Sequence, residues 1–278
     1  MNKNVRLLTL AAVALAIFSS VGCNKLRARD QLNKGVEAYK NTHYEEAINH
    51  FQQAVQLDPK LLNARLYLAT AYVGQYIPGV DSPDNVSVAE QAIAQFQQVI
   101  DDHPSREQKV NSAKGIASLY FNMKKFDDAK KYNRIVSDLD PNDADPYYSI
   151  GVIDWTQSYA PRMEERAKLG LKPEEHLNAK NKDQKKVCDE LKQKNLPIVQ
   201  EGIDNLKKAI ELRPDYDDAM AYMNLMYREK ADIECDDLAA RAEDLKTADG
   251  WLDKNLAVRK AKAEIQPGAQ GIVNDQAK

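Results

Sequence analysis

The sequence lacks the patterns from which sheets, metal sites and nucleotide sites are built. It holds only 11 glycines among 278 residues, and few alternating β-branched runs, which argues against a large β-sheet. It has no CxxC or HxxxH spacing to bind zinc and no glycine-rich loop to bind a phosphate. The net charge of −3 provides no strongly basic face for nucleic acid. We therefore expect no cofactor, no metal and no nucleic-acid partner.

Groupings of side chains that catalyse reactions are also missing. None of the histidines has a serine, cysteine or carboxylate partner at a catalytic spacing. Adjacent acids such as Glu45 and Glu46 are expected to lie in solvated turns. A binding protein is therefore predicted, and an enzyme is the last of the alternatives. The four histidines are His43, His50, His103 and His176.

The apolar run near the start of the chain, Leu7 to Phe18, has 12 residues, which is short for a membrane-spanning helix. It follows a positively charged start and precedes small residues and Cys23, an order typical of a secretion signal. These residues resemble the signal of bacterial lipoproteins, in which residues 1–22 are removed and lipid is attached to the cysteine. Ser20 departs from the family, which prefers leucine there. An ordinary cleaved signal and an uncleaved anchor remain alternatives.

The lipoprotein resemblance also implies a location. Removal of Met1–Gly22 takes away two positive charges and leaves a net charge of −5. The family often has an aspartate after the cysteine for retention in the inner membrane, so Asn24 favours the outer membrane. We expect a lipid-anchored protein of the cell envelope, facing the periplasm, with a polar tether over residues 23–30.

The segment from Gly35 to Pro59 has the pattern of two short helices folded against each other. Asn41 and Thr42 lie in the turn, and Pro59 ends the second helix because the residue before a proline is disfavoured in a helix. A hairpin of this size cannot bury both of its apolar faces alone, so it requires stacked copies. Copies are present, and their helix-ending prolines are Pro59, Pro104, Pro141 and Pro214.

The repeats resemble the tetratricopeptide repeat (TPR) family from Gln31 to Asp232. Small residues recur where helices cross and aromatic residues follow one turn later, because a small residue permits close approach and a ring fills the gap beside it. Lys34 departs from the family, and the fifth copy has no recognisable second half. The matching residues are Gly35, Ala69, Ala117 and Gly151, then Tyr72, Tyr120 and Tyr227, and in the second helices Ala47, Ala92, Ala129, Phe51, Phe96, Ala54 and Ala209.

The resemblance implies an all-α fold, a right-handed solenoid of four to five antiparallel helical hairpins over residues 31–263. Two insertions interrupt it. Residues 77–88 are predicted to be a loop because prolines, glycine and short polar residues gather there. Residues 156–197 are predicted to be an exposed excursion with two short polar helices, Arg162–Leu169 and Asp183–Lys194. Either insertion is alternatively a contact site for a partner.

A long helix is predicted from Asp236 to Ala263, with apolar residues along one stripe. It is expected to cap the last repeat and to turn a polar face outward. Residues 264–278 show no period and are predicted to be a disordered tail. The stripe consists of Leu238, Ala242, Leu245, Ala248, Leu252 and Leu256.

Two cysteines, Cys188 and Cys235, remain as an even pair in an oxidising compartment if Cys23 carries lipid. In stacked antiparallel hairpins, the start of one repeat's second helix lies beside the end of the next repeat's first helix. Cys188 precedes the second helix of the fourth repeat, and Cys235 follows the first helix of the fifth. We therefore predict a disulfide that pins the 156–197 insertion to the solenoid.

The TPR resemblance implies that a partner binds the concave face, which the first helices line. Aromatic residues there would anchor a peptide, and polar residues would hydrogen-bond to its backbone. Trp155 and Phe121 are alternatively part of the core. The residues predicted on this face are Tyr39, Leu66, Thr70, Asn111, Lys114, Ser118, Phe121, Asn122, Tyr148, Val152, Trp155 and Arg228.

These observations predict a lipid-anchored periplasmic adaptor that binds partner proteins through its concave face during assembly of outer-membrane or envelope complexes. Two alternatives stay open. One is a carrier for peptides or glycans, with a pocket at Trp155 and Tyr159 that the fourth-repeat insertion closes. The other is a structural subunit of a secretion or pilus complex, bound through convex faces. The sequence identifies no particular partner.

Overall fold

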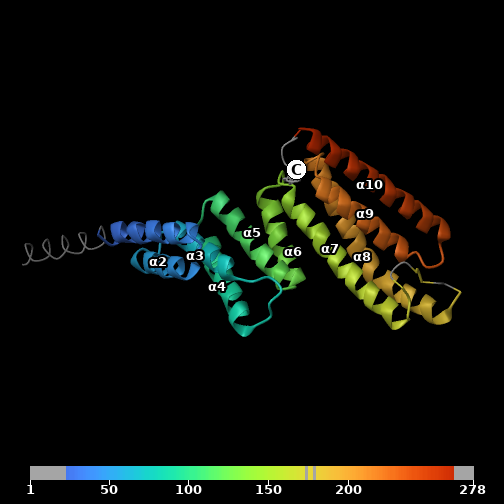
Figure 1. The fold of residues 1–278 in the computed structure, drawn as a ribbon, viewed down its shortest axis with the longest axis horizontal. Helices are drawn as coiled ribbons and strands as arrows, with labels where there is room; N and C mark the ends of the chain where they lie inside the picture. Colours follow the sequence, from blue (N-terminus) through green and yellow to red (C-terminus); the bar gives the residue numbers. More distant parts are fainter. Residues whose placement is uncertain (1–22, 173–174, 178–179, 266–278) are drawn as a thin grey trace, which may run out of the picture. The chain divides into compact units, whose positions relative to one another are not determined.

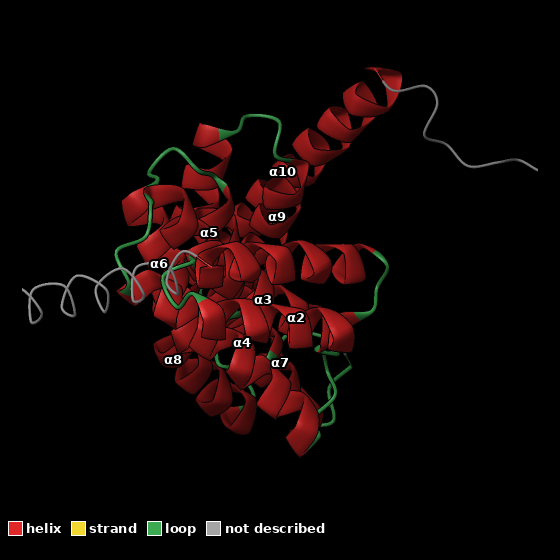
Figure 2. Cartoon of the chain, turned by 90° about the vertical axis from the view of Figure 1, so that its left-hand side faces the viewer, coloured by secondary structure: helices red, strands yellow, loops and turns green. Residues whose placement is uncertain are grey.

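The computed structural model describes residues 23–172, 175–177 and 180–265, and all regular secondary structure in these ranges is helical (Figures 1 and 2). The helices follow one another as antiparallel hairpins, so the predicted all-α fold of TPR-like repeats is confirmed. The chain divides into two compact units, with the boundary between Leu139 and Asp140. The predicted signal peptide over residues 1–22 and most of the predicted tail, residues 266–278, lie outside the described residues.

The first unit is a stack of three hairpins. The first hairpin pairs the helix over residues 23–40 with α2, and Ala38 of that helix shares a hydrophobic core with Ala47 and Phe51 of α2. Helices α2 and α4 each contact the first helix of the following hairpin. The helices are α2 (Tyr44–Leu57), α3 (Leu62–Gln75), α4 (Pro83–Asp101), α5 (Arg106–Asn122) and α6 (Phe126–Leu139).

The second unit contains two hairpins with a core of their own. Helix α9 packs against both helices of the preceding hairpin, and α10 packs along α9 (Figure 1). Helix α10 therefore takes the place of the second helix of the fifth repeat, which the sequence did not reveal. The helices are α7 (Asp145–Lys168), α8 (Lys182–Leu212), α9 (Asp217–Asp232) and α10 (Leu238–Ile265).

Glycines at the helix crossings explain the small-residue pattern of the repeats. A Cβ atom on Gly35 would lie 2.5 Å from a ring carbon of the buried Phe51. A Cβ atom on Gly151 would lie 2.4 Å from Cγ of the buried Leu206. Both distances are too short for non-bonded carbon atoms. The large side chain of one helix therefore occupies the space that any larger residue on the other helix would need.

The predicted polar tether over residues 23–30 has a different local structure, because these residues are helical and continue into the first hairpin. Ala28 is completely buried. The segment is rich in good helix formers, and Asp30 forms an ion pair with Lys34, one turn later, at 2.8 Å. Cys23 is exposed and joins the first hairpin without an intervening loop.

The predicted loop over residues 77–88 is shorter than expected, because α4 begins at Pro83. Ser82 caps the helix by accepting a hydrogen bond from the backbone N–H of Asn85 at 3.3 Å. The buried side chain of Asn85 donates to the carbonyl oxygens of Ile77 and Val80, at 2.8 and 2.7 Å. Serine followed by proline is a helix-start signal, which the loop-like composition of the segment obscured.

The two helices predicted within residues 156–197 are present, but the prediction that they are short and form an exposed excursion is wrong. Helix α7 continues through Pro161, and α8 begins at Lys182 and continues through Pro197. A proline inside a helix costs about 3 kcal/mol, so tertiary contacts must offset it. They include the buried side chains of Leu177, Cys188 and Leu191, which the charge-rich sequence around them concealed.

The predicted C-terminal helix is present as α10, but only part of its predicted apolar stripe is buried. Ala248 is completely buried and Leu245 is half-buried, whereas Leu238, Leu252 and Leu256 are exposed and Asp244 and Asn255 are buried. The polar side chains are buried because each finds a partner in the α9 region. Lys230 donates to the Asp244 carboxylate at 2.7 Å, and Asn255 donates to the Asp217 carbonyl at 2.6 Å.

Substitution of Gly151 by alanine should destabilise the second unit. The new methyl group would collide with Leu206, and overpacking of this kind costs about 1–3 kcal/mol. Gly250→Ala in α10 is a matched control, because no atom lies within 4 Å of the added Cβ. That change should stabilise the helix by up to about 1 kcal/mol. Thermal unfolding of both variants checks the prediction, and equal effects of the two substitutions would contradict it.

Candidate functional site

Five aromatic rings follow one another along α7 and the beginning of α9, and we call them the aromatic strip. Tyr148 lies between Tyr216 and Tyr222, with ring centroids 4.9 and 5.7 Å away. Trp155 lies 5.6 Å from Tyr222 and 4.8 Å from Tyr159. These separations are typical of aromatic pairs in contact. The strip is therefore continuous across the two helices.

The position of the strip follows from helix geometry. Tyr148, Trp155 and Tyr159 are seven and four residues apart, so they share one stripe of α7. Tyr222 comes from α9, and Tyr216 immediately precedes that helix. Helices α7 and α9 are the first helices of neighbouring hairpins, and they contact each other. The rings therefore gather on first helices, the elements that the sequence analysis assigned to partner binding.

The rings are partly buried and partly open to solvent. Tyr159 is 37% exposed. Trp155 is half-buried and packs against the core of the second unit, so it contributes to both the core and the strip. Burial raises the pKa of Tyr148 to about 12, with smaller contributions from Tyr222 and the nearby Asp218 carboxylate. The phenol of Tyr148 therefore stays protonated at neutral pH and can donate a hydrogen bond.

An arginine lies over the ring at each end of the strip. The Arg213 guanidinium is 4.3 Å from the centroid of Tyr216, and it donates to the Asp145 carboxylate at 2.9 Å. The Arg162 guanidinium is 5.4 Å from the centroid of Tyr159. Cation–π contacts of this kind fix the ring positions. The strip thus combines apolar ring surface with phenol donors and has an ion-paired arginine at each end.

A buried ion cluster behind the strip joins α7 to α9. Arg162 donates two hydrogen bonds to the carboxylate of Glu229, at 2.7 and 2.6 Å, and the two residues are only 4% and 3% exposed. Asp232 lies 2.8 Å from Arg162 and 3.3 Å from Arg166. Burial raises the pKa of Glu229, although Arg162 acts in the opposite direction. The cluster fixes the spacing of the helices that carry the rings.

The first unit carries the other residues predicted on the partner face. Asn111 and Ser118 of α5 are exposed and accessible to a partner. Tyr39 and Leu66 pack against the core of this unit, and Phe121 contacts Phe126 with ring centroids 6.1 Å apart. The remaining residues of this set are half-buried: Thr70, Lys114 and Asn122.

Arg228 of α9 has contacts different from those predicted. Its guanidinium forms an ion pair with Asp249 of α10 at 2.7 Å and donates to Asn224 at 3.3 Å. It therefore helps to hold α10 against α9, whereas Tyr148 and Trp155 belong to the aromatic strip. Val152 is half-buried and lies between these two residues on the same stripe of α7.

Tyr216, Tyr222 and Arg213 belong to this site but were not among the residues predicted for it from the sequence. Tyr216 and Tyr222 lie more than 60 residues after Tyr148, so no local spacing connects them to it. The seven- and four-residue spacing of Tyr148, Trp155 and Tyr159 was a usable signal for the α7 half of the strip. The α9 half depends on the packing of two hairpins.

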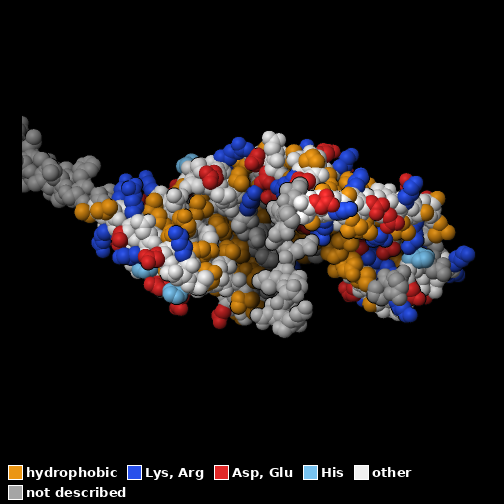
Figure 3. Space-filling view, turned by 45° about the horizontal axis from the view of Figure 1, so that its top comes forward, with side chains coloured by type: hydrophobic (Ala, Val, Ile, Leu, Met, Phe, Trp, Pro, Cys, Tyr) orange, Lys and Arg blue, Asp and Glu red, His pale blue; other side chains and the backbone are white. Residues whose placement is uncertain are grey.

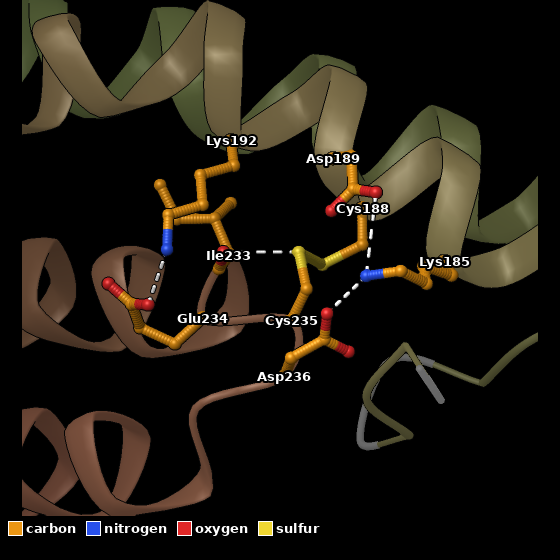
Figure 4. The surroundings of a disulfide bond; sticks show 8 residues. All are labelled: Lys185, Cys188, Asp189, Lys192, Ile233, Glu234, Cys235 and Asp236. Atoms are coloured by element: carbon orange, nitrogen blue, oxygen red, sulfur yellow. Dashed lines mark hydrogen bonds and ion pairs between the residues drawn. A yellow bond between two sulfur atoms is a disulfide. The ribbon is translucent and has the colours of Figure 1, made fainter. Parts of the chain in front are cut away.

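A disulfide joins Cys188 near the start of α8 to Cys235 in the segment after α9, with Cα atoms 5.8 Å apart (Figure 4). Two ion pairs flank it. Lys185 pairs with Asp236, and Lys192 lies 2.6 Å from Glu234. The bond therefore lies where the stacking of antiparallel hairpins was predicted to bring the cysteines together, and it pins the extended part of α8.

A cavity beside the disulfide is not the pocket that the carrier alternative requires. Trp155 and Tyr159 are absent from its lining. The cavity has acidic and basic walls, a mixture that selects neither anions nor cations. Figure 3 likewise shows acidic and basic side chains interspersed on the visible surface. The cavity is lined by the basic residues Lys180 and Arg241, the acidic residues Asp232, Glu234 and Asp236, and His176.

Within residues 23–172, 175–177 and 180–265, no group of three or more histidine, cysteine, aspartate or glutamate side chains is placed to hold a metal ion. Of the helices in these ranges, none combines the length and the apolar character that crossing a membrane requires.

Cys235→Ser should lower the thermal stability of the second unit. Loss of a bond across 47 residues of chain costs up to about 4 kcal/mol of unfolding free energy in the chain-entropy account. Cys23→Ser is the control, because Cys23 is a free thiol. Thiol titration of the denatured, unreduced protein gives an independent measurement. Reactive thiols at Cys188 and Cys235 would contradict the bond.

Arg162→Leu should destabilise the protein at neutral pH by about 3–5 kcal/mol, because it leaves the buried Glu229 carboxylate without its main partner. Burial raises the folded-state pKa of Glu229, so protonation favours the folded variant. The penalty should therefore be largest above that pKa and shrink as the pH falls toward about 4. Thermal unfolding at several pH values measures it.

Lys168→Leu is the control for this variant, since Lys168 is an exposed cation on the same helix with only surface ion pairs to Glu164 and Glu165. It should leave the unfolding free energy almost unchanged, because solvent screens exposed ion pairs. A pH-independent penalty in Arg162→Leu, or equal penalties in the two variants, would show that Glu229 does not carry a buried charge.

Comparison with known proteins supports the repeat assignment in one segment. The tetratricopeptide repeat family model matches residues 28–61, which include the first hairpin and Pro59. No curated protein sequence matches the chain significantly.

Solved structures share the fold over most of the chain. A crystal structure of the MamA protein is 15% identical, covers 86% of this chain and 96% of its own, and superimposes with a TM-score of 0.54. A MamA structure from Desulfovibrio magneticus RS-1 is 14% identical, with coverages of 85% and 97% and a TM-score of 0.54. YrrB, described as a TPR protein with an unusual peptide-binding site, is 13% identical, with coverages of 89% and 97% and a TM-score of 0.52. At these identities the comparison establishes the fold: the chain folds as tetratricopeptide repeat proteins do.

Proposed function

We propose that this chain is a scaffold that binds a protein or peptide partner through the aromatic strip, without catalysing a reaction. The observation that carries the proposal is the continuous run of five partly exposed rings on α7 and α9. Aromatic side chains supply much of the binding energy at protein interfaces, because each buries a large area at a small entropic cost.

The chemistry of the strip suits a peptide that lies across the first helices. Ring faces would pack against apolar or proline side chains of the partner. The phenols of Tyr148 and Tyr222 stay protonated, since burial raises the pKa of both, and they can donate to peptide carbonyl oxygens. The ion cluster of Arg162 and Glu229 holds the two helices in place, so little ordering is needed when the partner binds.

The fold supports the same proposal. The chain shares its fold with YrrB, whose description includes a peptide-binding site. The exposed polar side chains of Asn111 and Ser118 on α5 are a candidate second contact area, on the first helix of a hairpin in the first unit.

We further propose that lipid on Cys23 anchors the protein to the outer membrane, facing the periplasm, where it would take part in assembly of envelope complexes. Three observations support an anchor at this point. Cys23 follows a sequence that resembles a lipoprotein signal, it is exposed, and it has a free thiol. The Cys188–Cys235 disulfide suits an oxidising compartment. Because residues 23–40 are helical, the anchor would hold the first hairpin close to the membrane surface.

A crosslinking pull-down of the tagged, membrane-anchored protein tests the partner proposal. A double variant, Tyr159→Ala with Tyr222→Ala, removes two rings of the strip. Recovery of a specific envelope protein should fall about tenfold, the effect of losing roughly 1.4 kcal/mol of binding energy. Tyr67→Ala is the control, since Tyr67 is a comparably exposed tyrosine, 42%, that also stacks on another ring, Phe51.

Unchanged recovery in the strip variant would contradict the proposed site. Absence of any specific partner would contradict the scaffold function and would favour the alternative function, a carrier for peptides or glycans. Cys23→Ser tests the anchor separately. This variant should leave the membrane fraction while its strip stays intact, and retention in the membrane would contradict lipid attachment at Cys23.

A further inference from the structure

Helix α10 is attached to its own chain through polar contacts and through the apolar Ala248 and Trp251, of which Trp251 packs against the core of the second unit. Its buried face carries Asp244, Ala248 and Asn255. Asn224 donates to the Ala248 carbonyl at 2.6 Å, and Lys230 to the Asp244 carboxylate at 2.7 Å. Near its end, Lys262 lies 2.7 Å from the Asp217 carboxylate. Hydrogen bonds and ion pairs therefore hold this helix in place.

Three of the four leucines of α10 are left in solvent, and the fourth, Leu245, is half-buried. Leu238 is 70% exposed, Leu252 is 40% exposed and Leu256 is 55% exposed. Single exposed leucines are common on protein surfaces, but several along one helix form an apolar face. A helix that ended the repeat stack would be expected to turn polar residues outward. In α10, three leucines lie among the exposed polar residues.

The spacing of these residues is that of a helix that packs against another helix. Leu238, Ala242, Leu245, Asp249, Leu252 and Leu256 are separated by alternate steps of four and three. This spacing places them along one seam, as in the a and d positions of a coiled coil. Leu245 in this seam is half-buried, and Asp249 pairs with Arg228 of α9 at 2.7 Å, so the exposed apolar part of the seam consists of Leu238, Leu252 and Leu256. At 1.5 Å per residue, the 28 residues of α10 give a seam of about 40 Å.

The charges of α10 are divided between its two parts. Residues 238–253 contain four acidic and two basic side chains, a net charge of −2. Residues 254–265 contain four basic and one acidic side chain, a net charge of +3. Acidic residues near the start of α10 and basic residues near its end also interact favourably with the dipole of the helix, so the charges alone would not indicate a partner. The exposed leucines beside these charges do indicate one.

We propose that α10 forms a two-fold interface with α10 of a second copy of this chain, with the helices antiparallel and their leucine seams in contact. Antiparallel packing places the acidic part of each helix beside the basic part of the other, whereas parallel packing would place like charges together. A two-fold interface requires a self-complementary surface, and α10 meets that requirement in the spacing of its exposed leucines and in the distribution of its charges. The interface would leave the aromatic strip accessible, because the strip lies on α7 and α9.

Sedimentation of the full chain across a dilution series tests this inference. Every sample should carry Cys23→Ser, so that lipid on that residue cannot bring copies together. The protein should sediment at twice the mass of one chain. Leu252→Gln with Leu256→Gln should return it to the mass of one chain without lowering its unfolding temperature, since both side chains are exposed. Leu26→Gln is the matched control, a 72% exposed leucine in the first unit, and should remain a dimer.

Charge exchange tests the antiparallel arrangement. Glu243→Lys with Asp253→Lys makes both parts of α10 positive, and Lys254→Glu with Lys260→Glu makes both parts negative. Each variant alone should be monomeric, and an equal mixture should recover the dimer mass. A monomeric parent chain, a dimer that survives the leucine substitutions, or a mixture that stays monomeric would each overturn the proposal. None of these results depends on the partner of the aromatic strip.

Discussion

Close approach of helices at glycine is the constraint on which both units depend. In the first unit Gly35 accepts the ring of Phe51, and in the second unit Gly151 accepts Leu206. In each case the large side chain fills the space that a Cβ atom would take, so the two helices of a hairpin can touch along their length. Stacked hairpins then bury the apolar faces that a single hairpin would leave in water. The first helices of neighbouring hairpins come together as a consequence, and this brings α7 beside α9.

The second unit adds polar contacts to this apolar framework. Arg162 and Glu229 are buried as a hydrogen-bonded pair between α7 and α9, and a buried ion pair contributes more to defining a geometry than to net stability. Its position behind the aromatic strip connects it to function, because it fixes the spacing of the rings. The disulfide between Cys188 and Cys235 lies just beyond the same end of α9, where it holds the extended start of α8. A rigid strip binds a partner with a smaller entropic cost than a mobile one.

Helix α10 shows how one element can serve two surfaces. Several of its polar side chains form contacts within the chain, and three of its four leucines are exposed. The proposed partner surface and the proposed self-association surface therefore lie on different helices. A dimer of this kind would present two aromatic strips together, which would raise the apparent affinity for a partner with two binding segments.

The sequence by itself determined the repeat architecture, because small residues, aromatics and helix-ending prolines recur at spacings that local packing requires. It also indicated the pairing of Cys188 with Cys235, since the order of hairpins fixes which helix ends meet.

Tertiary structure decided the remaining features. Helices α7 and α8 continue through Pro161 and Pro197 because contacts with distant segments offset the lost hydrogen bonds. The leucines of α10 did not predict its orientation, since the ion pairs and hydrogen bonds with α9 stabilise an orientation that leaves most of the leucines exposed. The aromatic strip needed Tyr148 and Tyr222 from different hairpins, and no local pattern records which side chains of two hairpins will meet.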